Sequence, residues 1–189
     1  MNMLKLIYAY AGHVMLWTFV LRALFASVTP AWFAQSPTQK ILCLVLLALP
    51  SLVIAYFTLG MLSQLSAAFT FLLFIGLTHF VHGFPPSAMP VWLFAGVAFT
   101  GLLLYASALG FMRIDLYAWG YQARWLALVA VILALALWAS APIVSWALAF
   151  ALLAFALQIG ASRNLWDYLL DPILFFTAVY LLVRHFIRG

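Results

Sequence analysis

The sequence contains no glutamate and only three aspartates, and charged residues make up 6% of its 189 positions. A soluble domain carries about 25% charged residues, which keep its surface hydrated. Hydrophobic residues make up 69% of this chain, so the polar groups are too few to cover a water-soluble globule. Because the polar stretches are also short, we expect a single transmembrane domain over residues 1–189, with no soluble domain.

Cysteine is scarce as well. The one cysteine, Cys43, lies within an apolar run, which excludes a disulfide framework, a CxxC redox pair and a thiolate metal site. The net charge of +5 comes from basic residues near the ends of apolar runs, a pattern typical of topology signals and lipid-headgroup contacts. A nucleic-acid-binding protein would need a clustered basic face, which this sequence lacks. Membrane lipids are therefore the expected partners, and nucleic acid is not.

Motifs for the commoner enzyme classes are missing as well. The sequence has no HExxH, no GxSxG, no glycine-rich phosphate loop and no acid-rich metal motif, so the usual hydrolase and transferase sites are excluded. No lysine lies in the last apolar run, which excludes a retinal Schiff base. We expect no cofactor and no bound metal.

Apolar runs of about 20 residues cross a bilayer as helices, and such runs fill this chain. The sequence therefore predicts an all-α, polytopic membrane helix bundle with six or seven transmembrane helices. The clearer predicted spans are residues 4–28, 41–65, 66–84, 91–112 and 165–187. Polar connections are expected at 29–40, at 83–90 and at 113–124, where Tyr117, Trp119 and Tyr121 predict an aromatic belt at the membrane surface.

Residues 125–160 leave the number of crossings open. A continuous helix over this segment would be about 54 Å long, too long for one crossing of a core about 30 Å thick. Ala141-Pro142 divides the segment into two apolar runs, 125–140 and 143–160. We expect two short, alanine-rich helices that either both cross the membrane or form a re-entrant hairpin.

The distribution of Lys and Arg favours six net crossings over seven. Arg22 lies within a span and is not counted. With a cytoplasmic N-terminus, seven crossings place four of the other seven residues inside and three outside, whereas six crossings place five inside and two outside. The positive-inside rule favours the second arrangement. We accordingly expect a multi-pass protein of a bacterial-type inner membrane, with the N-terminus in the cytoplasm.

The start of the last span carries the most informative charges. Arg163, Asp167 and Asp171 are spaced by four, so they share one face if a helix runs through all three. Asp171 lies inside the apolar run, and an ionisable group there marks a functional site or a buried partner. Asp167 and Arg163 have a simpler interpretation as groups that cap a helix at the interface.

Arg22 is the other charge within an apolar run. With six crossings, the first and last spans are antiparallel, and Arg22 could form an ion pair with Asp171 at a similar depth. With seven crossings, the two residues lie near opposite surfaces. The pair could be a structural clamp or a substrate site, and Arg22 could instead extend to the headgroups.

The four histidines do not form a good haem pair, because His13 and His79 differ in predicted depth by about 10 Å. His79 and His82 are three residues apart, but no acid or cysteine nearby in sequence completes a metal site. We interpret them as interfacial histidines. Contact with a lipid phosphate is the more specific alternative.

These observations favour a non-catalytic membrane subunit. It would scaffold a larger membrane complex with another membrane protein subunit, or form part of a path for a lipid-linked or apolar small molecule. The first alternative is a small intramembrane enzyme acting on a lipid, with His79, His82, Asp167 or Asp171 as acid–base groups. The second is a self-sufficient secondary transporter, which the Pro50 and Pro142 interruptions leave open.

Overall fold

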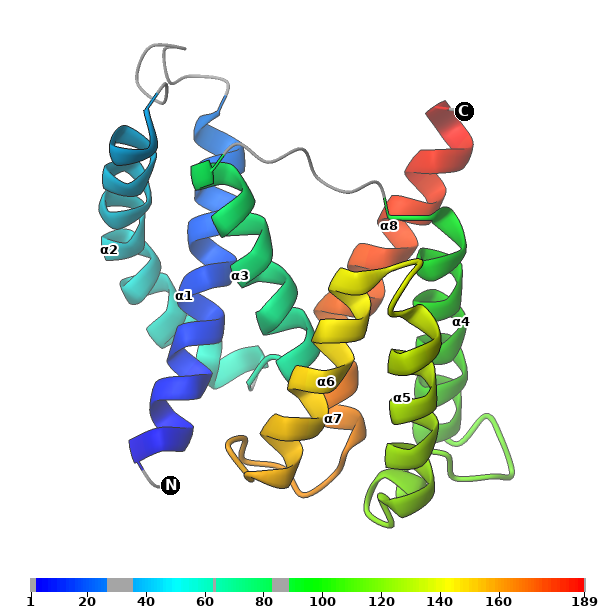
Figure 1. The fold of residues 1–189 in the computed structure, drawn as a ribbon. Helices are drawn as coiled ribbons and strands as arrows, with labels where there is room; N and C mark the ends of the chain where they lie inside the picture. Colours follow the sequence, from blue (N-terminus) through cyan, green and yellow to red (C-terminus); the bar gives the residue numbers. More distant parts are fainter. Residues whose placement is uncertain (1–2, 27–35, 63, 83–88, 189) are drawn as a thin grey trace. The chain divides into compact units, whose positions relative to one another are not determined.

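A computed structural model describes residues 3–26, 36–62, 64–82 and 89–188 of the chain, and every regular element within these ranges is helical (Figure 1). This confirms the predicted all-α class. In chain order, the helices are α1 (Met3–Phe25), α2 (Pro37–Leu62), α3 (Ala67–His82), α4 (Val91–Ala108), the 3-10 helix η2 (Ala118–Gly120), α5 (Arg124–Leu137), α6 (Pro142–Ala156), α7 (Trp166–Leu169) and α8 (Pro172–Arg188). The predicted connections at 29–40 and 83–90 lie largely outside the described ranges.

Three helices in the described part of the chain, α1, α2 and α4, are long and apolar enough to cross a membrane. The prediction of six or seven spans does not agree with this result. The other apolar helices are shorter: α3 has 16 residues, α5 has 14 and α6 has 15. At 1.5 Å per residue they extend over about 21 to 24 Å, less than the hydrocarbon core of about 30 Å. The structure therefore fits a helical membrane protein with fewer full-length spans than the hydropathy pattern suggests.

The chain forms two compact units, which we describe separately. The first comprises residues 1–65, 70–87 and 159–161 and contains α1, α2 and most of α3. The second comprises residues 66–69, 88–158 and 162–189 and contains α4 to α8 together with the first turn of α3. In the first unit α1 packs on α2, and in the second α4 packs on α8 while α5 and α6 form a hairpin (Figure 1).

The α5–α6 hairpin confirms the two short helices predicted over 125–160. Proline at the first position of α6 has no N–H to contribute to the preceding turn, so the break falls at Pro142. Alanines of both helices are buried, and the Ser145 hydroxyl donates a 2.7 Å hydrogen bond to the carbonyl of Ala134. Small side chains let the two backbones approach closely. Whether this hairpin crosses the membrane or re-enters stays a prediction.

No single helix runs through residues 163 to 171, so the predicted last span is wrong in its first part. Arg163 lies in a bend, Asp167 lies in the four-residue helix α7, and Leu170 is extended with φ −147° and ψ 131°. Proline at 172 disfavours a helical conformation for the residue before it and suits the first position of a new helix. Arg163, Asp167 and Asp171 therefore do not share a helix face.

Local capping signals explain two helix starts. The hydroxyl of Ser36 accepts the N–H of Gln39 at 3.2 Å, and the Gln39 side chain accepts the N–H of Ser36 at 3.1 Å. This reciprocal capping box, with Pro37 at the first position, begins α2 four residues before the apolar run. At α3, the Ser66 hydroxyl accepts the N–H of Phe69 at 3.2 Å.

Helix α4 ends earlier than the predicted residue 112 because Gly110 adopts a left-handed conformation, with φ +81°. The N–H of Gly110 donates to the Ser107 carbonyl at 3.0 Å, and the N–H of Phe111 donates to the Ala106 carbonyl at 2.9 Å. This pair of bonds is a Schellman motif, in which glycine avoids the Cβ clash of the left-handed region.

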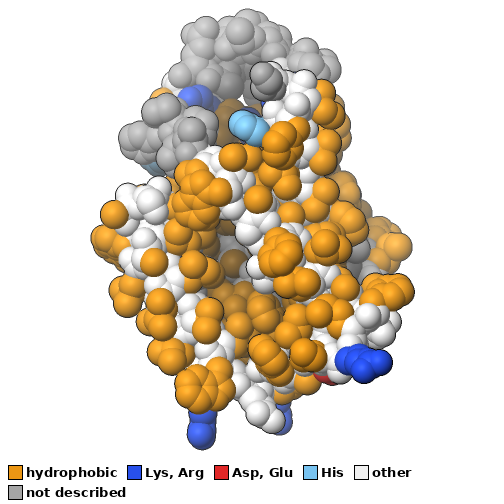
Figure 2. Space-filling model, turned by 90° about the vertical axis from the view of Figure 1, so that its right-hand side faces the viewer, with side chains coloured by type: hydrophobic (Ala, Val, Ile, Leu, Met, Phe, Trp, Pro, Cys, Tyr) orange, Lys and Arg blue, Asp and Glu red, His pale blue; other side chains and the backbone are white. Residues whose placement is uncertain are grey.

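The outer surface is apolar. Figure 2 shows a face covered mainly by hydrophobic side chains, with few charged groups. Along α2, for example, Leu49 is 60% exposed, Val53 is 62% exposed and Phe57 is 66% exposed. Exposed apolar area on this scale is not tolerated by a monomeric soluble protein and is expected where lipid is the solvent. The predicted membrane environment agrees with this surface.

Candidate functional site

Asp171, the most prominent candidate from the sequence, is buried and caps a helix. One carboxylate oxygen accepts the N–H of Leu174 at 2.8 Å, which is the third residue of α8. The other accepts the N–H of Ser66 at 2.9 Å, immediately before α3. Both interactions lie within the second unit. A negative charge at helix N-termini is favourable, because the free N–H groups there point outward from the helix.

The backbone contacts give Asp171 a structural role that the sequence pattern did not indicate. The two oxygens of its carboxylate serve two different helix starts, α8 through Leu174 and α3 through Ser66. Arg22, the predicted ion-pair partner, belongs to the first unit. The pairing of Arg22 with Asp171 stays a prediction.

Asp167 lies at the centre of a polar cluster formed by two loop segments of the second unit. The Tyr117 hydroxyl donates to both oxygens of the Asp167 carboxylate, at 2.9 and 3.0 Å. Burial, followed by the hydrogen bond and negative charge of Asp167, raises the pKa of Tyr117 above its ordinary value. Tyr117 therefore stays a neutral donor throughout the physiological pH range. It does not serve only as a member of an interfacial aromatic belt.

Asn164 completes this cluster, and the sequence analysis missed it. Its side chain is fully buried; the amide nitrogen donates to the Tyr117 carbonyl at 2.9 Å, and the oxygen accepts the Trp166 N–H at 3.0 Å. The backbone of Gly120 is close beside it, and the Leu165 N–H donates to the Gly120 carbonyl at 3.0 Å. The cluster fixes η2 and α7 against each other. A lone buried asparagine has no sequence signature, so spacing could not have revealed it.

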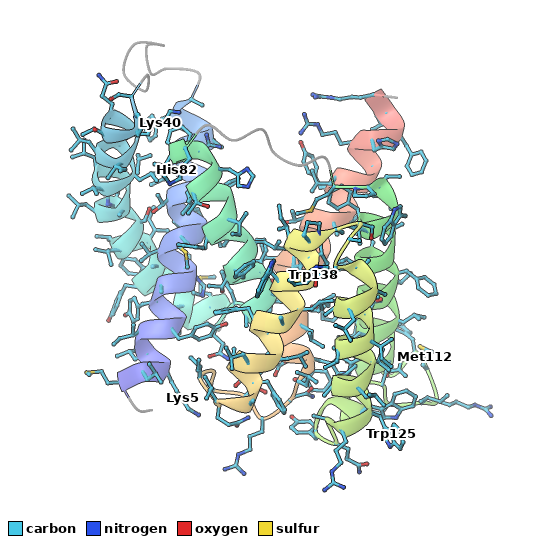
Figure 3. All side chains as sticks on the ribbon, viewed as in Figure 1. Lys5, Lys40, His82, Met112, Trp125 and Trp138 are labelled. Carbon is cyan, nitrogen blue, oxygen red and sulfur yellow. The ribbon has the colours of Figure 1, made fainter. Side chains whose placement is uncertain are left out.

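An apolar cavity of about 570 Å³ lies beside this cluster, within the second unit. Helices α4 and α5, the loop between them and Trp166 of α7 border it, and its lining includes Phe99, Leu103, Val129, Trp119 and Trp125. The cavity opens to the surface, since Trp125 is 77% exposed. Trp125 is labelled at the start of α5 in Figure 3. The polar side chains of the lining are Thr100 and Gln122. A volume between 300 and 1,000 Å³ with mainly hydrophobic walls is typical of small-molecule sites.

Three indoles therefore line one cavity at the end of the unit where the α4–α5 loop and α7 meet. Trp166 is fixed by a 2.9 Å hydrogen bond from its indole nitrogen to the Leu116 carbonyl. Trp119 was predicted as part of an interfacial belt; the structure places it in the cavity wall with 58% of the residue exposed, and the belt stays a prediction. Arg124 is exposed and lies in the sequence between Gln122 and Trp125, two residues of the cavity lining.

His13 takes part in a buried network between α1 and α2 of the first unit. Its Nδ1 lies 3.2 Å from the Thr58 hydroxyl oxygen, which also accepts the Trp17 indole N–H at 3.0 Å. Thr58 has a single hydroxyl hydrogen, and it is used in a 3.0 Å bond to the Ile54 carbonyl. All three contacts hold together if Nδ1 of His13 carries a proton and donates. His13 is thus a structural donor within the helix pair.

Thr58→Val should lower the free energy of unfolding by about 1–3 kcal/mol, because the buried donors of His13 and Trp17 would lose their acceptor. The measurement is unfolding of the detergent-solubilised protein by increasing sodium dodecyl sulfate, followed by circular dichroism. Thr78→Val is the matched control, since among the residues that the structure describes the Thr78 hydroxyl bonds the carbonyl of Ile75 in its own helix. Equal losses in the two variants would contradict the network.

His79 and His82 lie in α3 within the first unit, whereas Asp167 and Asp171 lie in the second. In the described part of the chain, no group of three or more His, Cys, Asp or Glu side chains could hold a metal ion. Arg163 is exposed in its bend, without a described ion pair. Each titratable residue singled out from the sequence is thus placed separately, and the structure does not assemble them into one catalytic group within either unit.

Comparison of this chain with protein-family models, with curated proteins and with solved structures finds no match.

Proposed function

We propose that this protein is a non-catalytic membrane subunit that forms part of a path for a lipid-linked or apolar small molecule. The cavity of the second unit carries this proposal. Its volume suits a hydrocarbon chain or a ligand of similar size, its walls are apolar, and its indoles offer rigid flat surfaces for such a molecule. An apolar ligand gains free energy by leaving water for these walls.

The bonding of the acidic residues supports the non-catalytic part of the proposal. Both oxygens of Asp171 accept backbone N–H groups, and both oxygens of Asp167 accept the Tyr117 hydroxyl. A general acid or base must reach the substrate proton directly or through one water. Carboxylates already engaged with backbone and phenol are poorly suited to that role, so energy or chemistry would come from a partner subunit.

The proposed location is a bacterial-type inner membrane, with a cytoplasmic N-terminus. The apolar surface and the three span-length helices support a membrane location. The orientation rests on the positions of seven of the eight Lys and Arg residues, because Arg22 lies within a predicted span.

Filling the cavity provides the test. In Val129→Trp, the larger side chain would project into the cavity, and we expect the lipid or apolar molecule that copurifies with the protein to fall about tenfold. A single obstructive contact of this kind costs on the order of 1–3 kcal/mol. Mild-detergent purification, followed by mass spectrometry of bound lipids and proteins, measures the change. Val131→Trp is the matched control, because Val131 is an exposed residue of α5 outside the cavity lining.

Unchanged ligand in Val129→Trp would reject the cavity as the path. A stoichiometric membrane partner recovered with the wild-type protein would support the subunit role. A protein recovered alone, with catalytic turnover of its bound lipid, would instead favour the intramembrane enzyme.

A further inference from the structure

Two cations of the first unit converge on one aromatic ring. The Arg22 guanidinium carbon lies 4.7 Å from the centre of the Phe80 ring and 5.3 Å from that of Phe19. The Lys40 ammonium lies 5.8 Å from the centre of the same Phe80 ring. The three helices α1, α2 and α3 each contribute to this cluster. Cation–π attraction holds each charge near the ring but does not neutralise either.

The first unit contains no residue that could neutralise these charges. Asp115, Asp167 and Asp171 are the only acidic residues of the sequence, and all three belong to the second unit. Within the described residues, the Arg22 Nε is buried and has no hydrogen-bond partner. A buried N–H without an acceptor is costly, and the two neighbouring positive charges repel each other. An anion with several acceptor oxygens would remove both penalties.

The position of the cluster identifies the class of anion. Arg22 lies in the last turn of α1, and Lys40 lies in the first turn of α2; both are helices apolar enough to span a membrane. Figure 3 shows Lys40 and His82 at one end of this unit and Lys5 at the other. Ends of membrane-spanning helices lie at the level of lipid headgroups. A guanidinium matches phosphate oxygens in a bidentate arrangement, and an ammonium adds a point charge.

We propose that Arg22 and Lys40 bind the phosphate of an anionic membrane lipid, with Phe80 as the platform that positions both cations. This site does not depend on the cavity of the second unit. The lipid phosphate would accept the Arg22 Nε–H and reduce the repulsion between Arg22 and Lys40.

The test uses the full-length protein in mild detergent, titrated with phosphatidylglycerol and, separately, with phosphatidylcholine, with bound lipid counted by native mass spectrometry. Phosphatidylglycerol should bind more tightly than the zwitterionic lipid. Arg22→Gln and Lys40→Gln should each weaken phosphatidylglycerol binding about fivefold, the value of one basic residue near an anionic headgroup. Lys5→Gln, which removes a cation at the other end of the unit, should leave this binding unchanged.

Two further variants separate the geometry of the site from its net charge. Arg22→Lys keeps the charge but loses the planar fork, so it should bind the lipid more weakly than the wild type and more tightly than Arg22→Gln. Phe80→Leu removes the platform without changing any charge and should also weaken binding. Phe74→Leu is its matched control, because Phe74 is an exposed aromatic of the same helix. These variants keep the test decisive if Arg22→Gln folds poorly.

Three results would overturn the proposal. The first is a Lys5→Gln variant that loses as much lipid affinity as Arg22→Gln. This would indicate that the lipid responds to the net charge of the protein and not to a defined site. The second is unchanged binding in both Lys40→Gln and Phe80→Leu. The third is displacement of the lipid by inorganic phosphate alone at millimolar concentration, which would identify free phosphate as the ligand. Val129→Trp should retain wild-type phosphatidylglycerol affinity here, so failure of the cavity and failure of this site are distinguishable.

Discussion

Asp171→Ala should lower the free energy of unfolding by about 2–4 kcal/mol. The variant removes the helix cap at Leu174, worth about 1 kcal/mol, and leaves the Ser66 N–H without its acceptor, at about 1–3 kcal/mol. Asp171 is only 6% exposed, so water cannot easily replace the lost oxygens. The measurement is the sodium dodecyl sulfate unfolding transition of the protein in mild detergent, followed by circular dichroism.

Asp171→Asn tests the same interaction with less disturbance. The amide oxygen of asparagine can still cap α8, but its NH₂ group would face the N–H of Ser66, and two donors repel. We therefore expect a loss smaller than that of Asp171→Ala but clearly measurable. Asp115→Ala and Asp115→Asn are the controls, because Asp115 makes the same kind of bond, 2.9 Å to the Ala118 N–H, in an exposed position. Substitution there should change stability little.

The Arg22–Asp171 ion pair predicted from the sequence would give a different result for stability. If Arg22 neutralised Asp171, Arg22→Leu would restore the stability that Asp171→Asn loses, and the double variant would be milder than the sum of its parts. Bonding of Asp171 to two backbone N–H groups predicts additive losses instead. Additivity would support the capping role, and compensation would support the ion pair. An enzyme that uses Asp171 as an acid–base group would lose turnover in Asp171→Asn whatever its stability.

Hydropathy predicted the helical class and most helix positions, because in a chain this apolar every long run must satisfy its backbone groups as a helix. The same signal overestimated span length. Gly110 ended α4 early, although this residue was visible in the sequence, whereas the break at Pro142 was predicted and the structure agrees with it. Hydropathy averages over a window, so it cannot assign a boundary to one left-handed residue. Local capping signals such as the Ser36–Gln39 box define boundaries better.

The candidate site was harder to predict for a different reason. Asp171 was singled out as unusual, but its partners are backbone N–H groups, which all residues except proline carry and which sequence spacing cannot distinguish. The regular spacing of Arg163, Asp167 and Asp171 suggested a shared face that the extended Leu170 removes. The cavity depends on how α4, α5 and α7 pack, so of its tryptophans only Trp119 was singled out from the sequence, as an interfacial residue.

Gly120→Ala should have the largest effect on stability in this protein, with a loss of about 3–5 kcal/mol in the free energy of unfolding. A Cβ at this position would overlap the Asn164 Oδ1 and would lie 2.7 Å from the Trp166 Cδ1. Asn164 cannot move aside without cost, because its buried amide bonds the Tyr117 carbonyl and the Trp166 N–H. Displacing it would leave buried polar groups unpaired.

Gly96→Ala is the matched control for this glycine, since Gly96 lies in α4 of the same unit and a Cβ there meets no atom within 4 Å. Alanine is the better helix former, so this control should be neutral or stabilising by up to about 1 kcal/mol. The overlap can be tested directly by combining Gly120→Ala with Asn164→Ala. Because the first substitution already displaces the asparagine, the double variant should cost much less than the two single losses added together.

The same variant connects the polar cluster with the proposed path. Gly120 lies between Trp119 and Gln122, two residues of the cavity lining, and Trp166 lines the cavity from α7. Displacement of η2 should therefore reduce copurified lipid as well as stability, whereas Gly96→Ala should affect neither. If Gly120→Ala is destabilised but copurifies with as much lipid as the wild type, the polar cluster does not shape the cavity. That result would count against the proposed path. Loss of both together would support a cavity whose walls are held in place by Asn164.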